Sequence, residues 1–430
     1  MVPIEEIYRL FLKFPRITTD SRNVPQNSVF FGIKGDQFDG NRFAGEALSK
    51  GAAFAITDDP LVINGDRFLL VPDTLQALQQ LAAIHRRKIS AKIIGITGSN
   101  GKTTTKELVG SVLSSTFKTV ITPGNLNNHI GVPLTILSLK EDTSFGVVEM
   151  GANHPGEIAA LCRIARPGFG IITNIGKAHL EGFGNFEGVI KAKSELYDFI
   201  RQEEGIAFVN YDNPLLSRLS RGMNIYSYGI GENMWCKGKI AERDPSLAVA
   251  WKAGERSGFI RSRLYGDYNF ENIMAAITVG SYFGVSPGKI ENAISTYQPE
   301  NNRSQVARTE HNVLLLDAYN ANPSSMAAAL KNFHNYSALA KMVILGDMME
   351  LGEHSLEEHR EIIILARKLS LGRVCCVGEQ FCQVAKGGNE LCFSNLQLAE
   401  QWFRDHPARN LTILLKGSRK MQLEKLINLF

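Results

Sequence analysis

Short apolar runs alternate with segments of helical periodicity along most of the chain. The clearest pair is the apolar run 93–97 and the segment 108–113, in which apolar residues recur at helical spacing. Strand, turn and helix follow one another in the same order several times before and after this pair. Such alternation is typical of α/β proteins with parallel sheets. The pattern therefore predicts an α/β fold.

The same pattern divides the 430 residues into three predicted domains. Residues 1–90 indicate a small α/β unit, too short for a catalytic fold and suited to holding a substrate. Residues 91–300 indicate a central parallel-sheet domain, in which 225–265 alternate in the manner of β-strands. Residues 301–430 indicate a second doubly wound, Rossmann-like domain. The polar stretch 298–302 is the predicted linker.

Composition narrows the class of protein. The net charge is +4, and no basic run is long enough to suggest a nucleic-acid-binding surface. No apolar stretch approaches the roughly 18 residues of a membrane span. The six cysteines are scattered and form no paired CxxC motifs, so neither a zinc site nor a disulfide framework is expected. We expect a protein of the reducing cytoplasm.

The turn after the run 93–97 has the composition of a phosphate-binding loop. Glycines let backbone N–H groups approach phosphate oxygens, and the positive end of the next helix faces the same anion. Lys102 has the reach to contact the β- and γ-phosphates, and a hydroxyl of Thr103 or Thr104 is suited to Mg²⁺. The usual pattern has an earlier glycine where this chain has Ile96, so the loop is a shortened variant. The predicted loop residues are Gly98, Ser99, Asn100, Gly101, Lys102, Thr103 and Thr104.

Two further polar side chains follow predicted strands. Glu149 ends the apolar run 145–149, and His179 comes shortly after the run 169–175. In open parallel sheets, ligands bind at the carboxyl ends of the strands. Glu149 is therefore a candidate Mg²⁺ ligand, with a buried structural acid as the alternative. His179 is either a ligand in the same crevice or a packed bystander.

Asparagines gather at three other places. The loop 122–133 carries three of them, as a binding loop or as ordinary turn residues. Asn269 and Asn272 share a helix face, so their amides are candidates for a purine edge, although Asn269 alone is also a candidate N-cap. Asn322 precedes Pro323 and is expected to cap a helix. The asparagines of the loop are Asn125, Asn127 and Asn128.

The last predicted domain repeats the pattern of a strand ending in an acid. Asp317 ends one such strand, and the basic loop 416–419 follows the last strand of the chain. Ser355 and Glu358 have the spacing of a capping box for a helix over 356–369.

Together these motifs resemble the Mur ligases, the cytoplasmic ATP-dependent amide-bond ligases of peptidoglycan synthesis. The resemblance covers essentially the whole chain, although 233–263 matches no motif of the family. The motifs shared across the family lie at 97–104, 149–152, 174–181 and 193–196. Those that indicate the subgroup lie at 122–133, 317–326, 346–352 and 416–419, and 20–22 and 38–40 match the family's first module.

The resemblance implies a reaction and its cofactors. ATP would activate the terminal carboxylate of a UDP-N-acetylmuramoyl-tripeptide as an acyl phosphate, which the amine of D-alanyl-D-alanine then attacks. Two Mg²⁺ ions are implied. A carbamylated lysine is implied at Lys193, although the residue pattern of the helix 187–200 alone indicates an exposed charge there.

The resemblance also assigns residues to roles. The catalytic set is Lys102, Glu149, His179 and Lys193. The implied ATP-binding residues are the loop Gly98–Thr104 with Asn269, Asn272, Arg303 and Asp317. The implied metal ligands are Thr103, Glu149, His179 and carbamylated Lys193. The implied substrate-binding residues are Ser21, Arg22, Asn125, Asn127, Asn128, Asn320, Asn322, Lys416, Ser418 and Arg419.

Other functions share part of this pattern. A sibling ligase that adds diaminopimelate or lysine, or a folylpolyglutamate synthase, would keep the phosphate loop but differ at 317–326. A nucleotide-binding regulator or transport ATPase would hydrolyse ATP without needing both a UDP-linked peptide and an amine. An inactive cell-wall scaffold is disfavoured because the four catalytic candidates occur together. For the ligase we expect a monomer that is open without ligands and closes about a hinge at 298–302.

Overall fold

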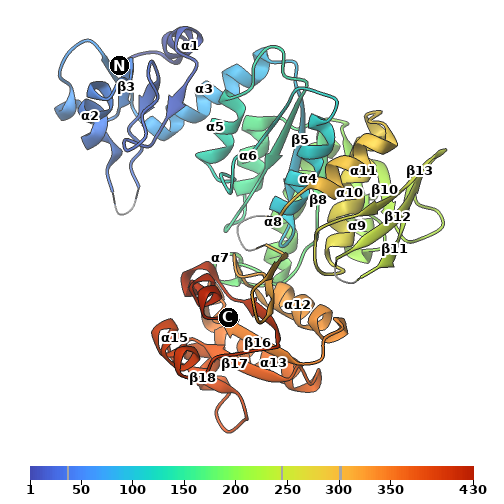
Figure 1. Ribbon diagram of the computed structural model, residues 1–430. Helices are drawn as coiled ribbons and strands as arrows, with labels where there is room; N and C mark the ends of the chain where they lie inside the picture. Colours follow the sequence, from blue (N-terminus) through green and yellow to red (C-terminus); the bar gives the residue numbers. More distant parts are fainter. Residues whose placement is uncertain (36–37, 244–245, 300–302) are drawn as a thin grey trace.

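Three separate sheets, each with helices packed against it, organise the chain (Figure 1). The structure is a computed structural model that describes residues 1–35, 38–243, 246–299 and 303–430. The lobes follow one another along the chain, and the central lobe lies between the other two (Figure 1). The predicted α/β fold with a central parallel-sheet domain is confirmed. The domain boundaries at 90 and 300 stay predictions, and 300–302 of the predicted linker lie outside the described residues.

The first lobe is built on a four-stranded sheet in the order β1-β2-β3-β4, with all neighbours parallel. The apolar strand residues Phe30 and Phe31 are both buried, as expected for a parallel sheet that is covered on both faces. The elements are α1 (Ile4–Lys13), β1 (Ile17–Thr18), β2 (Val29–Phe31), η1 (Gly40–Phe43), α2 (Ala44–Ser49), β3 (Phe54–Thr57), η2 (Pro60–Val62), β4 (Phe68–Leu70) and α3 (Thr74–Lys88).

The central lobe contains a nine-stranded sheet in the order β13-β12-β11-β10-β9-β8-β5-β7-β6. Strands β5 to β10 pair in parallel, and β11 pairs in parallel with β10. The predicted β-rich stretch 225–265 contains β10 and the antiparallel strands β11 to β13. Helices α4, α10 and α11 bury one face of the sheet, and α5, α6 and α8 cover the other.

The strands of this lobe are β5 (Lys92–Thr97), β6 (Thr119–Ile121), β7 (Phe145–Glu149), β8 (Phe169–Ile172), β9 (Ile206–Asn210), β10 (Asn224–Gly229), β11 (Cys236–Glu242), β12 (Ala248–Ala253) and β13 (Arg256–Arg261). Its helices are α4 (Lys102–Ser114), α5 (Gly131–Leu137), α6 (Glu157–Ala165), α7 (Leu180–Phe183), α8 (Phe186–Gln202), α9 (Pro214–Leu219), α10 (Asn269–Tyr282) and α11 (Pro287–Thr296).

Helix α3 connects the first lobe to the central one. The carboxylate of Asp73 caps it by accepting a hydrogen bond from the N–H of Gln76 at 2.7 Å. The helix packs against α1 in the first lobe and against α5 and α6 in the central lobe. Nε2 of His85 lies 2.9 Å from the carbonyl oxygen of Leu139. The helix is thus part of the packing of both lobes.

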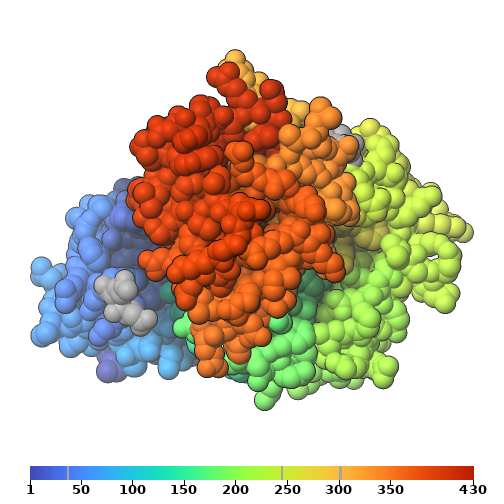
Figure 2. Space-filling model, turned by 90° about the horizontal axis from the view of Figure 1, so that it is seen from below, coloured from blue at the N-terminus to red at the C-terminus, as the bar shows by residue number. Residues whose placement is uncertain are grey.

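The third lobe contains a six-stranded sheet in the order β14-β15-β19-β16-β17-β18, in which only the β14–β15 pair is antiparallel. Viewed from below, this lobe lies in front of the other two (Figure 2). Its strands are β14 (Gln305–Arg308), β15 (Val313–Leu316), β16 (Lys341–Gly346), β17 (Arg373–Val377), β18 (Leu391–Phe393) and β19 (Thr412–Lys416). Its helices are α12 (Pro323–Asn335), η3 (Gly352–His354), α13 (Ser355–Lys368), α14 (Glu379–Val384), α15 (Leu396–Asp405), η4 (Arg419–Met421) and η5 (Leu423–Leu429).

The two helix starts predicted in this lobe have different outcomes. The side chain of Asn322 caps α12 as predicted, by accepting a hydrogen bond from the N–H of Ser325 at 2.9 Å. The predicted capping box of Ser355 and Glu358 is wrong, because α13 begins at Ser355 without a side-chain cap. The Glu358 carboxylate instead accepts a charge-assisted hydrogen bond from Nζ of Lys177 in the central lobe at 2.5 Å. Among the described residues, no helix is long and apolar enough to cross a bilayer.

Candidate active site

A cavity of about 970 Å³ collects side chains from the central and third lobes. Most of the site residues predicted from the sequence line it. Those from the central lobe are Ser99, Asn100, Gly101, Lys102, Thr103, Thr104, Asn125, Asn127, Asn128, Glu149, His179, Asn269 and Asn272, and those after the predicted linker are Arg303, Asp317, Asn320, Asn322 and Lys416. The predicted site residues that do not line it are Ser21, Arg22, Gly98, Lys193, Ser418 and Arg419.

The turn after β5 needs glycine at two positions. Gly98 has φ of 142°, and a Cβ there would lie 2.0 Å from Oγ1 of Thr173. Gly101 has φ of 78°, and a Cβ there would lie 2.6 Å from Oδ1 of Asn272. Helix α4 then begins at Lys102 without a side-chain cap. An uncapped helix start presents backbone N–H groups and the positive end of the helix dipole to an anion.

The loop after β8 holds this turn in place. The amide of Asn174 makes two hydrogen bonds with the backbone of Asn100, accepting from its N–H and donating to its carbonyl oxygen, each at 3.1 Å. Oγ1 of Thr173 donates to the same carbonyl oxygen at 2.6 Å. Asn174 belongs to a family motif but has no predicted role. Its position just after the neighbouring strand is the sequence signal for this contact.

The side chain of Lys102 is folded back on its own loop. Its Nζ donates to the carbonyl oxygens of Gly98 at 2.8 Å and Ser99 at 3.2 Å. Burial lowers the pKa of Lys102, and the carboxylates of Glu149 and Glu350 partly oppose this shift. The ammonium therefore lies beside the turn at which an anion would bind.

Glu149 is a buried carboxylate that the protein satisfies on one side only. Its Oε1 accepts hydrogen bonds from Nδ2 of Asn127 at 2.7 Å and from Oγ1 of Thr103 at 3.3 Å. Its Oε2 has no hydrogen-bond partner among the described residues. A carboxylate in a purely structural role would be expected to have both oxygens paired, because burial of an unpaired charge is costly.

Lys106 is a residue of this region that the sequence analysis missed. It lies one turn after Lys102 on α4 and is only 1% exposed. Its Nζ donates to the carbonyl oxygens of Thr122 and Gly124, both at 2.8 Å, and lies 3.8 Å from Oε2 of Glu149. The available signal was its spacing of four residues from Lys102, which places both lysines on the same helix face.

His179 contacts the third lobe. Its backbone is left-handed, with φ of 52°, an uncommon conformation for a residue other than glycine. Its Nδ1 lies 2.6 Å from Oε2 of Glu350, a close contact between the two lobes. Contact with the imidazole lowers the pKa of the Glu350 carboxyl.

Lys193 is fully buried, contrary to what the residue pattern alone indicates. Its Nζ donates one long hydrogen bond, of 3.3 Å, to the carbonyl oxygen of Ala152, a residue of the cavity wall. The ammonium also lies 5.2 Å from the centre of the Phe183 ring, which His179 contacts edge-on. Burial, with a smaller effect of Lys102, lowers the pKa of Lys193 to about 7.

Asn269 and Asn272 share a helix face, as expected. Nδ2 of Asn272 donates to Oδ1 of Asn269 at 2.8 Å, and Nδ2 of Asn269 donates to the carbonyl oxygen of Tyr265 at 2.7 Å. Oγ1 of Thr105 in α4 donates to Oδ1 of Asn272 at 3.0 Å. Asn269 does not cap α10, because no side chain caps this helix. The pair links α10 to the phosphate-loop helix.

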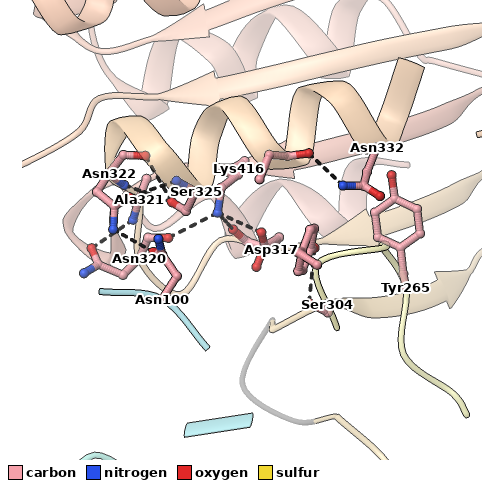
Figure 3. Close-up of polar contacts among 12 residues, drawn as sticks. Asn100, Tyr265, Ser304, Asp317, Asn320, Ala321, Asn322, Ser325, Asn332 and Lys416 are labelled. Carbon is pink, nitrogen blue, oxygen red and sulfur yellow. Dashed lines mark hydrogen bonds and ion pairs between the residues drawn. The ribbon is translucent and has the colours of Figure 1, made fainter. Parts of the chain in front are cut away.

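The third lobe reaches the cavity through its strand ends (Figure 3). Nζ of Lys416 donates to Oδ2 of Asp317 at 2.7 Å, and Nδ2 of Asn322 donates to Oδ1 of Asn100 in the phosphate loop at 2.8 Å (Figure 3). The guanidinium of Arg303 lies 3.5 Å from the centre of the Tyr319 ring. The contact of Asn322 with Asn100 joins the two lobes and is among those that their opening would break, and the open unliganded form stays a prediction.

The predicted contacts of the first lobe lie outside the cavity. Arg22 has 88% of its side chain exposed and forms an ion pair with Asp20 at 2.8 Å. Hydrogen bonds from Arg22 lower the pKa of Asp20 to about 2. The carbonyl oxygen of Ser21 accepts a hydrogen bond from Nζ of Lys50. The substrate-binding role of Ser21 and Arg22 stays a prediction.

Comparisons with known proteins agree with this arrangement. The chain matches the family models described as Mur ligase family, catalytic domain, over residues 13–86, Mur ligase middle domain over 96–280, and Mur ligase, glutamate ligase domain, over 302–419. It is 34% identical to UDP-N-acetylmuramoyl-tripeptide--D-alanyl-D-alanine ligase from Bacillus subtilis (strain 168) over 423 residues. This alignment covers 96% of this chain and 92% of the relative.

Solved structures show the same similarity. MurF from Acinetobacter baumannii superposes with a TM-score of 0.86 at 34% identity, over 96% of this chain and 92% of that one. MurF ligase from Thermotoga maritima in complex with ADP gives a TM-score of 0.86 at 28% identity, over 97% of each chain. The chain therefore belongs to the Mur ligase family, whose domains it matches from the first lobe to the third.

Proposed function

We propose that the chain joins D-alanyl-D-alanine to the terminal carboxylate of a UDP-N-acetylmuramoyl-tripeptide, with conversion of ATP to ADP and phosphate. The observation that carries the proposal is the cavity, in which a phosphate loop, a half-satisfied carboxylate and polar groups of the third lobe meet. The names of the similar proteins support the choice of substrates over a sibling ligase or a folylpolyglutamate synthase.

The chemistry requires activation of the carboxylate, because its oxygen is too poor a leaving group for direct amide formation. The carboxylate oxygen attacks the γ-phosphorus of ATP, ADP leaves, and an acyl phosphate forms. The amine of the dipeptide then attacks the acyl carbon to give a tetrahedral intermediate. This intermediate expels phosphate, the amine loses a proton, and the amide bond remains. Catalysis of such steps depends on positioning and charge stabilisation.

We assign the phosphate loop to the first step. The backbone N–H groups of the turn Gly98–Thr104 would hold the phosphate oxygens, and Lys102 would neutralise charge on the transferred group. Among the described residues, Lys102 donates hydrogen bonds only to carbonyl oxygens of its own loop, and an anion would be a stronger acceptor.

Thr103 and Glu149 fit a Mg²⁺ ion. Oε2 of Glu149, which accepts no hydrogen bond among the described residues, and the nearby hydroxyl of Thr103 are hard oxygen donors of the kind that Mg²⁺ prefers. The ion would supply charge neutralisation on the phosphates. Among the described residues, no three His, Cys, Asp or Glu side chains are grouped in a metal-binding arrangement, so other ligands are needed to complete a site.

Lys193 fits the carbamylation implied by the family. Addition of CO₂ requires a neutral amine, and the pKa of about 7 provides one near neutral pH. Carbamylation would replace a poorly paired cation with an anion, and its oxygens would serve as ligands of a second Mg²⁺ beside His179. The contact of His179 with Glu350 would have to be shared with such an ion or given up.

The family resemblance supports an assignment of the substrates to residues. Asn125, Asn127 and Asn128 line the cavity next to Glu149 and would bind the muramyl part. Ser21 and Arg22 would hold the UDP end from the first lobe. The adenine would lie near Asn269, Asn272, Arg303 and Asp317, and the dipeptide near Asn320, Asn322, Lys416, Ser418 and Arg419. We expect the reaction in the cytoplasm and a monomeric enzyme.

Phosphate release with purified UDP-N-acetylmuramoyl-tripeptide and single candidate amines tests the proposal. We expect one ADP and one phosphate for each amide product. They should form only when D-alanyl-D-alanine and the tripeptide are both present. Turnover with free diaminopimelate or lysine on the corresponding dipeptide precursor would indicate a sibling ligase. ATP hydrolysis without either substrate would indicate an ATPase, and no turnover under any condition would indicate a scaffold.

A further inference from the structure

Lys106 is a buried cation that the proposed reaction does not use. It is 1% exposed and does not line the cavity, so it has no direct access to a substrate. A lysine ammonium is costly to bury unless polar groups surround it. The groups that surround Lys106 therefore indicate what it does.

Two of these groups belong to the loop between β6 and α5. The ammonium donates to the carbonyl oxygens of Thr122 and Gly124, each at 2.8 Å. These two carbonyls stand at the start of the loop that carries the three cavity asparagines. Neither carbonyl depends on its side chain for this contact, so the lysine fixes the path of the backbone.

The far part of the same loop is attached to the end of β7. The carbonyl oxygen of Asn127 accepts a hydrogen bond from the N–H of Gly151 at 2.8 Å, and Nδ2 of Asn127 donates to Oε1 of Glu149 at 2.7 Å. Strand β7 also holds the start of the loop, because the N–H of Thr122 donates to the carbonyl oxygen of Val147 and Oγ1 of Thr122 accepts from the N–H of Glu149, each at 3.0 Å. Lys106 adds the contacts with α4, including the one at Gly124.

The charges around the ammonium complete the arrangement. Oε2 of Glu149 lies 3.8 Å from Nζ of Lys106, and Oε1 of Glu107 lies 3.7 Å away. Burial lowers the pKa of Lys106, whereas these two carboxylates oppose the shift and favour the charged form. Lys106 contacts both the loop and the carboxylate from the helix that begins with Lys102.

We infer that Lys106 is a positioning residue that ties the asparagine loop, residues 122–128, to the phosphate-loop helix α4. Through this tie the groups proposed to bind the muramyl substrate and those proposed to bind ATP share one rigid frame. The identity of the loop's ligand rests on the proposed function. The tie itself rests only on the contacts of Lys106.

The test compares Lys106→Met with Lys118→Met, a control at the next lysine along the chain, which is half exposed. Hydrogen exchange should become faster in 122–131 of Lys106→Met and stay unchanged in the control. Equilibrium binding of the UDP-N-acetylmuramoyl-tripeptide, measured without nucleotide or Mg²⁺, should weaken about tenfold or more, as expected when charge-assisted hydrogen bonds that order a site are lost. Affinity for ADP should change less than about threefold.

A second pair of variants separates positioning from folding. Lys106→Met leaves the Glu149 carboxylate buried without its nearby cation, so the single variant is expected to melt at a lower temperature. Lys106→Met/Glu149→Gln removes the unpaired charge and should recover much of the melting temperature. It should not recover slow exchange in 122–131 or affinity for the tripeptide. Lys106→Arg keeps the charge but not the compact ammonium, and should fall between wild type and Lys106→Met.

The outcomes are distinct. Normal exchange in 122–131 and normal tripeptide affinity in the folded variants would overturn the role of Lys106. Recovery of exchange, affinity and stability together in the double variant would also overturn it, because the lysine would then act only on the charge of Glu149. Failure of the wild type to bind the tripeptide would refute the proposed substrate, and the exchange measurement would still decide the role of Lys106.

Discussion

Two buried lysines of the central lobe have very different surroundings. Nζ of Lys106 has two carbonyl oxygens at 2.8 Å and a carboxylate at 3.8 Å, whereas Nζ of Lys193 has one carbonyl oxygen at 3.3 Å and the face of an aromatic ring. Burial lowers the pKa of Lys106, and the carboxylates of Glu149 and Glu107 oppose this shift. Burial lowers the pKa of Lys193 to about 7, and the neighbouring cation of Lys102 adds to the shift. The surroundings thus distinguish a paired cation from an amine that is available for reaction.

The ammonium of Lys102 has two carbonyl oxygens as partners. Its replacement should give the largest effect on activity. Lys102→Met removes the cation beside the proposed phosphate site, and the rate of phosphate release should fall roughly 10³-fold or more, as for the loss of other groups that stabilise transferred phosphate. The melting temperature should change little, because the hydrogen bonds that the ammonium makes to described residues all lie within its own loop. A rate within tenfold of the wild type would remove Lys102 from the site.

Lys193→Ala should lower the rate about 10²-fold, because it removes the proposed source of a metal-binding anion. Short carboxylates such as acetate or formate should restore part of the activity by occupying the space left by the side chain. Lys191→Ala, two residues away and exposed, is the matched control and should be fully active. Full activity of Lys193→Ala would make the lysine a structural residue only.

Lys193→Met tests whether the poorly paired Lys193 ammonium destabilises the fold. The free energy of unfolding is measured in CO₂-free buffer, so that the amine is not carbamylated. The pKa is 10.5 in the unfolded chain and about 7 in the folded one, so the unfolded chain binds more protons between these values. The lysine therefore costs the native state most below about pH 7, and the cost fades as pH rises toward 10.5. At about 1.4 kcal/mol per pKa unit, methionine should stabilise the fold by a few kcal/mol at pH 7 and by less at pH 9. Denaturant melts at both pH values measure this, and an equal gain at both would contradict it.

Arg22→Ala extends the comparison from buried lysines to a solvent-exposed cation. The side chain is 88% exposed and pairs only with Asp20 among the described residues, so the melting temperature should not change measurably. If Arg22 holds the UDP end, the KM for the UDP-linked substrate should rise a few-fold while the KM for ATP stays constant. Unchanged KM values for both would leave the turn 20–22 without a role in binding.

The parts of the site that the sequence predicted are those set by local rules. The strand β5, its glycine turn and α4 follow from apolar periodicity and from residues that only a tight turn requires. Glu149 was placed correctly because carboxyl ends of parallel strands meet at one edge of a sheet. Neither inference needed knowledge of which segments pack together.

The parts that the sequence missed depend on partners far away along the chain. Glu358 has the spacing of a capping box, but its partner is Lys177, 181 positions earlier. Lys193 follows the pattern of an exposed helix position, and its burial arises from packing of α8 with α6 and α7. The role of Lys106 requires the path of the loop after β6, which no spacing within α4 encodes.

The position of helix α3 (Thr74–Lys88) has a practical consequence for protein engineering. The helix packs on α5 and α6 and contacts the carbonyl oxygen of Leu139, so its loss would uncover an apolar face of the central lobe. A chimera that exchanges the first lobe between relatives should therefore be spliced just before the helix, near Asp73. A splice after the helix, at the boundary suggested by sequence alone, would pack α3 of one relative against α5 and α6 of another.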